Sequence, residues 1–184
     1  MKILIFGASG SGTTTLGKEL EKRSKFVHLD VDDYYWKVTQ PPFQEKVALE
    51  ERNQKLQTDF EKWTEVIVSG SLVSWGNYWE NAFDLAVFLY LKPEIRLKRL
   101  AQREHKRYGD QLNNNSQIRK TYQAFMEWAS HYDDPAFTGR SLSVHKNWIQ
   151  LLSCPVLYVE GEEELNTKVV NVMSEIKKRL PNTP

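Results

Sequence analysis

The chain has 184 residues, a length typical of one domain with a substantial buried core. Charged residues make up 27% of the chain but its formal net charge is only +1, so the composition gives no electrostatic basis for binding a nucleic-acid duplex. No stretch is long and apolar enough to cross a bilayer, and the opening apolar run is too short for a signal peptide, so we expect a cytoplasmic protein without a membrane partner.

Short apolar segments alternate with helical patterns along the chain. Five apolar runs are candidate strands, at residues 2–6, 26–29, 66–68, 85–91 and 156–159. Helices are expected at residues 13–23, 44–63, 93–108, 116–130, 143–152 and 167–180, and Asn113–Asn115 is expected to be a loop. In the helix at 44–63, a core-facing side is expected to contain Leu49, Leu56, Phe60 and Trp63. Short apolar strands separated by helices are typical of a parallel sheet covered on both faces, so we predict a three-layer α/β fold with a five-stranded parallel sheet.

A glycine-rich segment follows the first predicted strand. Residues 7–14, GASGSGTT, match the phosphate-binding pattern G-x-x-x-x-G-K-[ST], except that Thr13 occupies the lysine position. The glycines let backbone N–H groups point at one anion, and the following helix adds its positive end. A ligand-free turn is the alternative, but the position between strand and helix favours a P-loop. The residues expected to bind ATP are Gly7, Ser9, Gly10, Ser11, Gly12, Thr13, Thr14 and Thr15, with Thr14 also a ligand of Mg²⁺.

The missing lysine bears directly on catalysis. In a P-loop this lysine reaches the β- and γ-phosphates and offsets their charge during transfer. Thr13 can donate only a neutral hydrogen bond, which is about half as strong as a charge-assisted one. The sequence therefore predicts that another cation enters the site or that phosphoryl transfer is slow or absent.

Acidic and aromatic residues follow the second predicted strand. In a parallel sheet, ligands bind beyond the carboxyl ends of the strands, where Asp30, Asp32 and Asp33 would lie across from the P-loop. A carboxylate there could accept the proton of an acceptor hydroxyl or hold Mg²⁺ through water. Helix capping or simple solvation is the alternative for each acid. We predict catalytic roles for Asp32 and Asp33, and substrate contacts for Asp30, Tyr34 and Trp36.

The run Asp32-Asp33-Tyr34-Tyr35 resembles the Asp-Asp-aromatic-aromatic stretch of nucleoside kinases, and the wider layout resembles the adenylate-kinase-like family of P-loop kinases. The resemblance implies one P-loop domain over residues 1–184, with an acceptor-binding region at about 31–63 and an arginine-bearing lid at about 99–141. It departs from the family at Ser69, where nucleoside monophosphate kinases commonly have a magnesium-organising aspartate. Asp30 or Asp32 could take that role. Trp75 could line the acceptor pocket or pack in the core.

Four arginines follow the fourth predicted strand. Arg96, Arg99, Arg103 and Arg107 are spaced three, four and four residues apart, so they share one helical face. The helix resembles the lid-entry helix of small-molecule kinases, whose arginines bind phosphates with their planar forks. A solvated, salt-bridged face is the alternative. We predict that Arg99 and Arg103 act on the transferred phosphate and replace the missing lysine charge, with Arg140 a substrate contact from the far side of the lid.

These features together predict an ATP- and Mg²⁺-dependent phosphotransferase that acts on a small-molecule acceptor such as a nucleoside or nucleotide. The residues Thr13 and Ser69 support an alternative, a nucleotide-binding or regulatory protein that has lost efficient transfer. A nucleic-acid kinase is a third class, against which the near-neutral charge argues. The sequence leaves the acceptor, the preferred base and the oligomeric state open.

Overall fold

The computed structural model describes residues 1–179, so Leu180 of the predicted closing helix and residues 181–184 of the predicted domain lie outside the described part. The sheet is parallel and has the strand order β2-β3-β1-β4-β5. Its strands are β1 (Lys2–Gly7), β2 (Val27–Asp30), β3 (Val66–Ser69), β4 (Leu85–Tyr90) and β5 (Val156–Glu160). The predicted α/β class and the five-stranded parallel sheet are confirmed.

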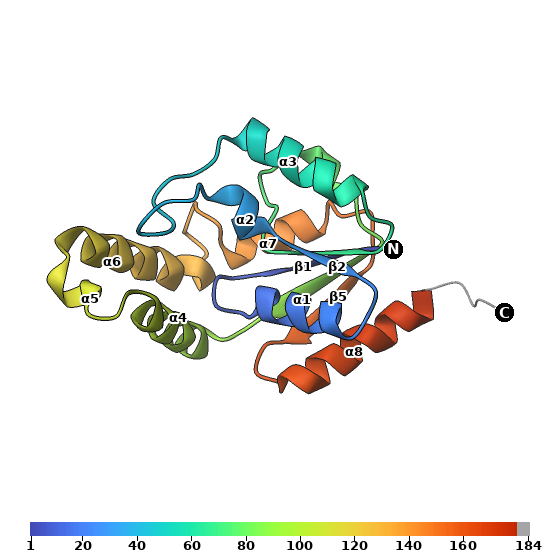
Figure 1. Ribbon diagram of the computed structural model, residues 1–184. Helices are drawn as coiled ribbons and strands as arrows, with labels where there is room; N and C mark the ends of the chain where they lie inside the picture. The colour runs from blue at the N-terminus through green and yellow to red at the C-terminus, as the bar shows by residue number, and fades with distance from the viewer. Residues whose placement is uncertain (180–184) are drawn as a thin grey trace.

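Helices connect the strands and cover both faces of the sheet (Figure 1). They are α1 (Thr13–Lys22), α2 (Val31–Tyr35), α3 (Leu49–Glu61), α4 (Pro93–Tyr108), α5 (Gln111–Asn114), α6 (Ser116–Ser130), α7 (Leu142–Ile149) and α8 (Leu165–Arg179), with 3₁₀ turns η1 (Asn77–Glu80) and η2 (His131–Asp133). Helices α1 and α8 cover one face, and α3 and α7 cover the other. The fold is therefore the predicted three-layer arrangement.

Each face of the sheet has its own hydrophobic core. Leu16 and Leu20 of α1 pack with Val172 of α8 on one side. Phe60 of α3 and Trp148 of α7 belong to the core on the other side. The central strands are buried on both faces, because helices cover both sides of a parallel sheet. This double burial explains why the strands are nearly continuous apolar runs in the sequence.

Helix α3 is shorter than predicted. The sequence indicated a helix over residues 44–63 with Leu49 and Trp63 on its core face, but α3 begins at Leu49. The chain before it is extended because Lys37 N–H donates to the Glu45 carbonyl (2.8 Å) and Val47 N–H to the Tyr35 carbonyl (2.9 Å). Leu49 and Trp63 are 46% and 45% exposed, so their predicted core positions are wrong.

Two short helices lie where the sequence indicated irregular structure. Asp30 ends β2 and its carboxylate accepts a hydrogen bond from the Asp32 N–H (3.0 Å), which starts α2. Helix α5 occupies part of the expected loop at Asn113–Asn115, of which Asn115 caps α6 by accepting from Ile118 N–H. These local side-chain bonds convert turn-forming residues into helix starts.

Helices α4, α5 and α6 form a separate group beyond the carboxyl ends of the strands (Figure 1). Helix α4 has the predicted bounds, from Pro93 to Tyr108, and it packs against α6. The loop after β1, helix α2 and this group therefore face the same edge of the sheet, which is where ligands bind in open parallel sheets.

Candidate active site

The glycine-rich loop has the geometry of an anion-binding loop. Gly10 and Gly12 have φ angles of 85° and 101°, conformations that residues with a Cβ rarely adopt. Helix α1 begins directly after Gly12, which makes no side-chain cap bond, so its first amides are free to bind a ligand. The Ser11 hydroxyl is buried without a hydrogen-bond partner among the described residues. This arrangement fits the phosphates of a nucleotide.

The three predicted acids at the end of β2 have different environments. Asp30 caps α2, whereas Asp32 and Asp33 lie exposed in the first turn of that helix. Enclosure by protein, followed by the charge of Asp30, raises the pKa of Asp32, and the positive charges of Arg140 and Arg103 oppose this. The same two causes raise the pKa of Asp33, which Lys18 opposes. Asp32 is thus the acid of the three that lies near both Arg140 and Arg103.

Arg140, in the segment between η2 and α7, contacts the glycine-rich loop. One of its Nη atoms lies 3.3 Å from the Ser9 hydroxyl, and its guanidinium lies 5.0 Å from the ring centroid of Trp128 on α6. The surrounding protein lowers the pKa of Arg140, and the charge of Asp32 is the largest opposing contribution. The structure therefore brings Ser9, Asp32 and Arg140 together.

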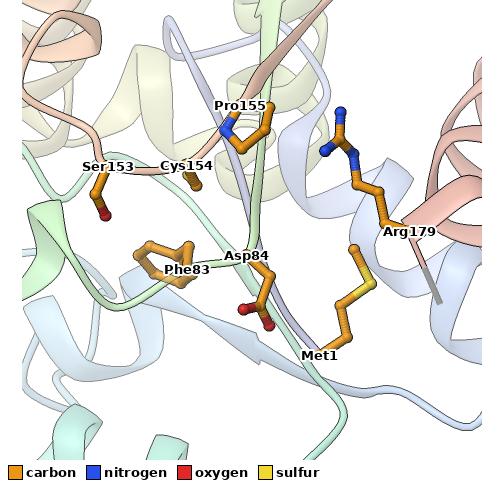
Figure 2. A pocket seen from close by; sticks show the side chains of 7 residues that line it. All are labelled: Met1, Phe83, Asp84, Ser153, Cys154, Pro155 and Arg179. Atoms are coloured by element: carbon orange, nitrogen blue, oxygen red, sulfur yellow. The ribbon is translucent and has the colours of Figure 1, made fainter. Parts of the chain in front are cut away.

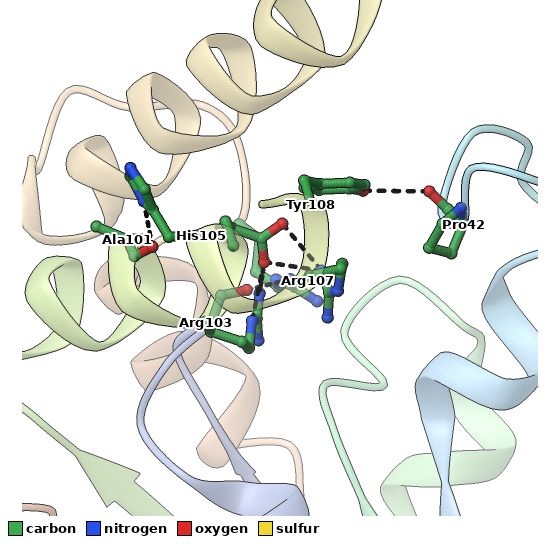
Figure 3. A network of polar contacts seen from close by, with 9 residues as sticks. Pro42, Ala101, Arg103, His105, Arg107 and Tyr108 are labelled. Atoms are coloured by element: carbon green, nitrogen blue, oxygen red, sulfur yellow. Dashed lines mark hydrogen bonds and ion pairs between the residues drawn. The ribbon is translucent and has the colours of Figure 1, made fainter. Parts of the chain in front are cut away.

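The arginine stripe on α4 is divided between several roles. Arg103 and Arg107 both bind the buried carboxylate of Glu104, at 2.9 and 2.7 Å (Figure 3). Arg99 is exposed, and its charge contributes, after burial, to lowering the pKa of Lys168. Lys168 in turn donates to the carbonyl of Gly161, in the loop after β5. Arg103 therefore lies near Asp32, whereas Arg99 lies near Lys168.

The first arginine of the stripe is structural. Arg96 is fully buried, donates to the Ala129 carbonyl (2.8 Å), and forms an ion pair with Asp133 (2.9 Å). These bonds tie α4 to the end of α6 and to η2. Arg96 therefore fixes α4 against α6 and η2 and is not available to a ligand.

The tip of α4 contacts the segment that precedes α3. Tyr108 donates a hydrogen bond from its hydroxyl to the Pro42 carbonyl (3.3 Å), as Figure 3 shows. The Arg107 guanidinium lies 4.3 Å from the ring centroid of Phe43. The outer end of α4 and the predicted acceptor-binding region, residues 31–63, thus touch each other.

The predicted aromatic substrate contacts are dispersed. The Tyr34 hydroxyl donates to Asp59 of α3 (2.9 Å), and Tyr34 and Trp36 line a pocket of about 660 Å³ between α2 and α3 that Asp33 also lines. Trp75 is buried in the core cluster under α3, the packing role that the sequence left open for it. Among the described residues, none of the three forms a hydrogen bond with Ser9 or Arg140.

Arg52 on α3 is a candidate that the sequence analysis missed. Its guanidinium lies 4.3 and 4.7 Å from the ring centroids of Tyr35 and Trp75, so it is held between two aromatic rings. No carboxylate within residues 1–179 pairs with it, and its buried Nε has no hydrogen-bond partner there. Tyr35 also lies within electrostatic reach of Arg140. The guanidinium donates one long hydrogen bond, to the Val47 carbonyl (3.5 Å), so its remaining donors can bind an anionic group of a ligand.

Ser69 differs from the acid that the resemblance implies, and the structure shows what it contacts. Its hydroxyl is buried and lies 2.8 Å from Nε2 of His28 on the neighbouring strand. Burial lowers the pKa of His28, which favours the neutral imidazole. The Ser69 hydroxyl is therefore engaged within the sheet, and the binding of Mg²⁺ by the oxygens of Thr14 and of Asp30 or Asp32 stays a prediction. Oxygen donors of this kind fit an ion that is also bound by phosphates and water.

A second pocket, of about 490 Å³, lies at the opposite end of the sheet (Figure 2). Met1 and Asp84 in its wall precede β1 and β4, and Pro155 precedes β5, so the pocket is at the amino ends of the strands. The half-buried Cys154 lines it, and burial raises the pKa of this thiol. Its position places it away from the glycine-rich loop, so it is not part of the candidate active site.

Comparison with known proteins agrees with this geometry. A family model described as an AAA domain matches residues 3–120, well over half of the chain. The chain belongs to this family. The matched range includes the glycine-rich loop, the acids after β2 and helix α4, and it ends before Arg140.

Individual relatives and solved structures support the same placement. The uncharacterized protein YqaC of Bacillus subtilis is 41% identical over 93% of this chain and 94% of its own length. A cytidylate kinase of Archaeoglobus fulgidus is 32% identical over 58% of this chain and 63% of that protein. The fold is similar to shikimate kinase from Bacteroides thetaiotaomicron (TM-score 0.58, 17% identity, 96% and 98% of the two chains) and to dATP-bound deoxyadenosine kinase from M. mycoides (0.58, 15%, 96% and 100%).

Residues 1–179 contain neither a membrane-spanning helix nor a cluster of metal-binding side chains. No helix there combines the length and the apolar character that a membrane span requires. No group of three or more His, Cys, Asp and Glu side chains in this part of the chain is arranged to hold a metal ion.

Proposed function

We propose that this protein is an ATP-dependent phosphotransferase that acts on a small-molecule acceptor, a nucleoside or nucleotide being the first class to test. The observation that carries the proposal is the meeting of three groups at the carboxyl edge of the sheet: the loop at Ser9, the acid Asp32 and the guanidinium of Arg140. A phosphate donor, a base toward an acceptor and a cation are the parts that phosphoryl transfer requires.

In this proposal each residue has a distinct task. The backbone amides of residues 7–14 bind the β- and γ-phosphates of ATP, and the Thr14 hydroxyl orients the metal-bound phosphates. Mg²⁺, when bound, offsets phosphate charge. Asp32 accepts the proton of the acceptor hydroxyl, and its raised pKa makes it a stronger base than an ordinary aspartate. Arg99 and Arg103 lie along the lid edge, where they contact the nucleotide.

Arg52 supports an acceptor that carries an anionic group. Its guanidinium is held between Tyr35 and Trp75, and no carboxylate among the described residues neutralises it. A planar guanidinium binds phosphate or carboxylate oxygens through two parallel hydrogen bonds. The predicted acceptor-binding region, residues 31–63, contains both Arg52 and Asp32, so one acceptor could contact both.

The experiment is a measurement of ADP release from Mg-ATP with a panel of nucleosides, nucleoside monophosphates and phosphorylatable metabolites. The wild type is compared with Asp32→Asn and with Asp110→Asn, an exposed acid whose side chain makes no cap bond on α5. Acceptor-dependent ADP release that Asp32→Asn abolishes and Asp110→Asn retains supports the proposal. ADP release that no acceptor stimulates refutes it.

A second candidate is a nucleotide-binding regulatory protein with little or no transfer activity. Thr13 in the lysine position and the engaged Ser69 hydroxyl favour it, because both remove charges that transfer uses in the resembling kinases. Tight binding of ATP, unchanged by every acceptor and without turnover, is the result that would establish this function in place of the first.

A further inference from the structure

The glycine-rich loop lacks the lysine of its motif, so the site needs a positive charge from elsewhere. Among the described residues, Arg140 is the cationic residue that hydrogen-bonds to a side chain of this loop, namely Ser9. Arg103, which the sequence favoured for this role, is 2.9 Å from the Glu104 carboxylate, and Arg99 is exposed beside Lys168. We propose that Arg140 supplies the triphosphate-binding charge that the P-loop lysine would supply.

The hydrogen bonding of Arg140 is incomplete within the protein. A guanidinium has five N–H donors and no acceptor. The Ser9 hydroxyl accepts from one Nη, and no carboxylate in residues 1–179 lies within ion-pair distance. The protein around the side chain disfavours the charged form enough to lower its pKa. A partly enclosed cation with unused donors next to a phosphate-binding loop is suited to an anionic ligand.

The position of Arg140 is fixed from several sides. The next residue, Ser141, is buried and caps α7 by accepting from the Val144 N–H (3.3 Å). The guanidinium lies over the Trp128 ring, which restricts its rotation without neutralising its charge. An arginine held in this way loses little conformational entropy when it binds a phosphate.

Three buried side chains, joined by hydrogen bonds, hold the loop that carries Arg140. The His145 imidazole lies 2.9 Å from the Ser71 hydroxyl and 2.7 Å from the Tyr132 hydroxyl. These bonds join the segment after β3, the 3₁₀ turn η2 and helix α7. Because η2 and α7 flank residues 134–141, these hydrogen bonds anchor both ends of the segment that presents Arg140.

The test is a comparison of nucleotide affinities by titration calorimetry, without any acceptor. The ligands are a non-hydrolysable ATP analogue and AMP, each with Mg²⁺. The variants are Arg140→Gln, Thr13→Lys and the double variant, with Arg119→Gln as the matched control. Arg119 is exposed on α6 and donates to the Asn113 carbonyl, away from the loop.

Arg140→Gln is expected to weaken binding of the triphosphate analogue about 10- to 100-fold, the range for a lost charge-assisted hydrogen bond, while AMP affinity changes less than about threefold. Thr13→Lys in the Arg140→Gln background is expected to restore triphosphate binding to within about threefold of the wild type, because a P-loop lysine reaches the same phosphates. Arg119→Gln is expected to bind both ligands like the wild type.

Three results overturn the inference: equal triphosphate affinity for Arg140→Gln and Arg119→Gln, an equal loss for AMP and triphosphate, or no recovery in the double variant. If Arg140→Gln does not fold, Arg140→Lys decides instead. Retention of the preference for triphosphate over AMP supports a role of the charge, and its disappearance overturns it.

The inference rests on the proposed function only in requiring a nucleoside triphosphate as ligand. Triphosphate binding that depends on Arg140, without acceptor-dependent ADP release, refutes the phosphotransferase and leaves the role of Arg140 standing. Failure of the wild type to bind the triphosphate analogue overturns both.

Discussion

Acidification is expected to destabilise the protein through His145. This imidazole is fully buried between the Ser71 and Tyr132 hydroxyls, and burial lowers its pKa from 6.5 to about 3, with the nearby charge of Arg140 adding to the effect. Because the folded state disfavours the proton, this contribution to stability is complete above the unfolded pKa of 6.5. It is lost as the pH falls from that value toward about 3.

The magnitude follows from the two pKa values. With 6.5 in the unfolded chain and about 3 in the folded protein, linkage gives a loss of about 2–3 kcal/mol in the free energy of unfolding between about pH 7.5 and about pH 4.5. The imidazole is inaccessible to solvent, so no screening by water reduces this figure. Other groups titrate over the same range, so the test needs a variant that removes this histidine alone.

The assay is urea unfolding, followed by tryptophan fluorescence, at a series of pH values. The wild type is compared with His145→Gln, in which a neutral amide can still bond both hydroxyls, and with Tyr132→Phe, which removes one partner but keeps the imidazole. The stability of the wild type is expected to fall by about 2–3 kcal/mol more than that of His145→Gln over this range, whereas Tyr132→Phe keeps the wild-type slope. Parallel curves for wild type and His145→Gln would refute the reasoning.

Three further substitutions test the packing and the site. Gly17→Ala would place a Cβ 2.5 Å from His28 Nε2 and is expected to cost about 1–3 kcal/mol in urea unfolding; a gain, as helix propensity alone predicts, would contradict this. Glu104→Gln leaves two arginines without their buried carboxylate and is expected to cost about 1–2 kcal/mol by the same assay, which unchanged stability would exclude. Arg52→Gln is expected to raise the acceptor KM about tenfold and leave that of Mg-ATP unchanged; equal effects on both would place Arg52 outside the acceptor site.

Features that depend on neighbours in the sequence were the ones that the sequence could predict. The glycine-rich loop is recognisable because a strand, three glycines and a helix start follow one another within residues 2–22. Helix α4 has the predicted bounds because Pro93 suits its first turn and Gly109 follows its last residue. Both features can be recognised without knowing the order of the strands in the sheet.

Features that depend on distant contacts were not predictable. Arg140 and Ser9 are separated by 131 residues, so no local pattern distinguishes Arg140 from the arginines of α4. Arg52 was missed because its two aromatic neighbours come from separate segments.

The two departures from the kinase pattern can be understood together as a change in where the charges come from. Thr13 removes one positive charge from the loop, and Ser69 removes one negative charge from the end of β3, so the local charge balance is preserved. The proposed roles of Arg140 and Asp32 return one charge of each sign to the same edge of the sheet. A lysine within the loop is present whether or not the lid is in place, whereas Arg140 reaches Ser9 from the segment between η2 and α7. Triphosphate binding would then depend on the position of the lid, which a P-loop lysine does not require.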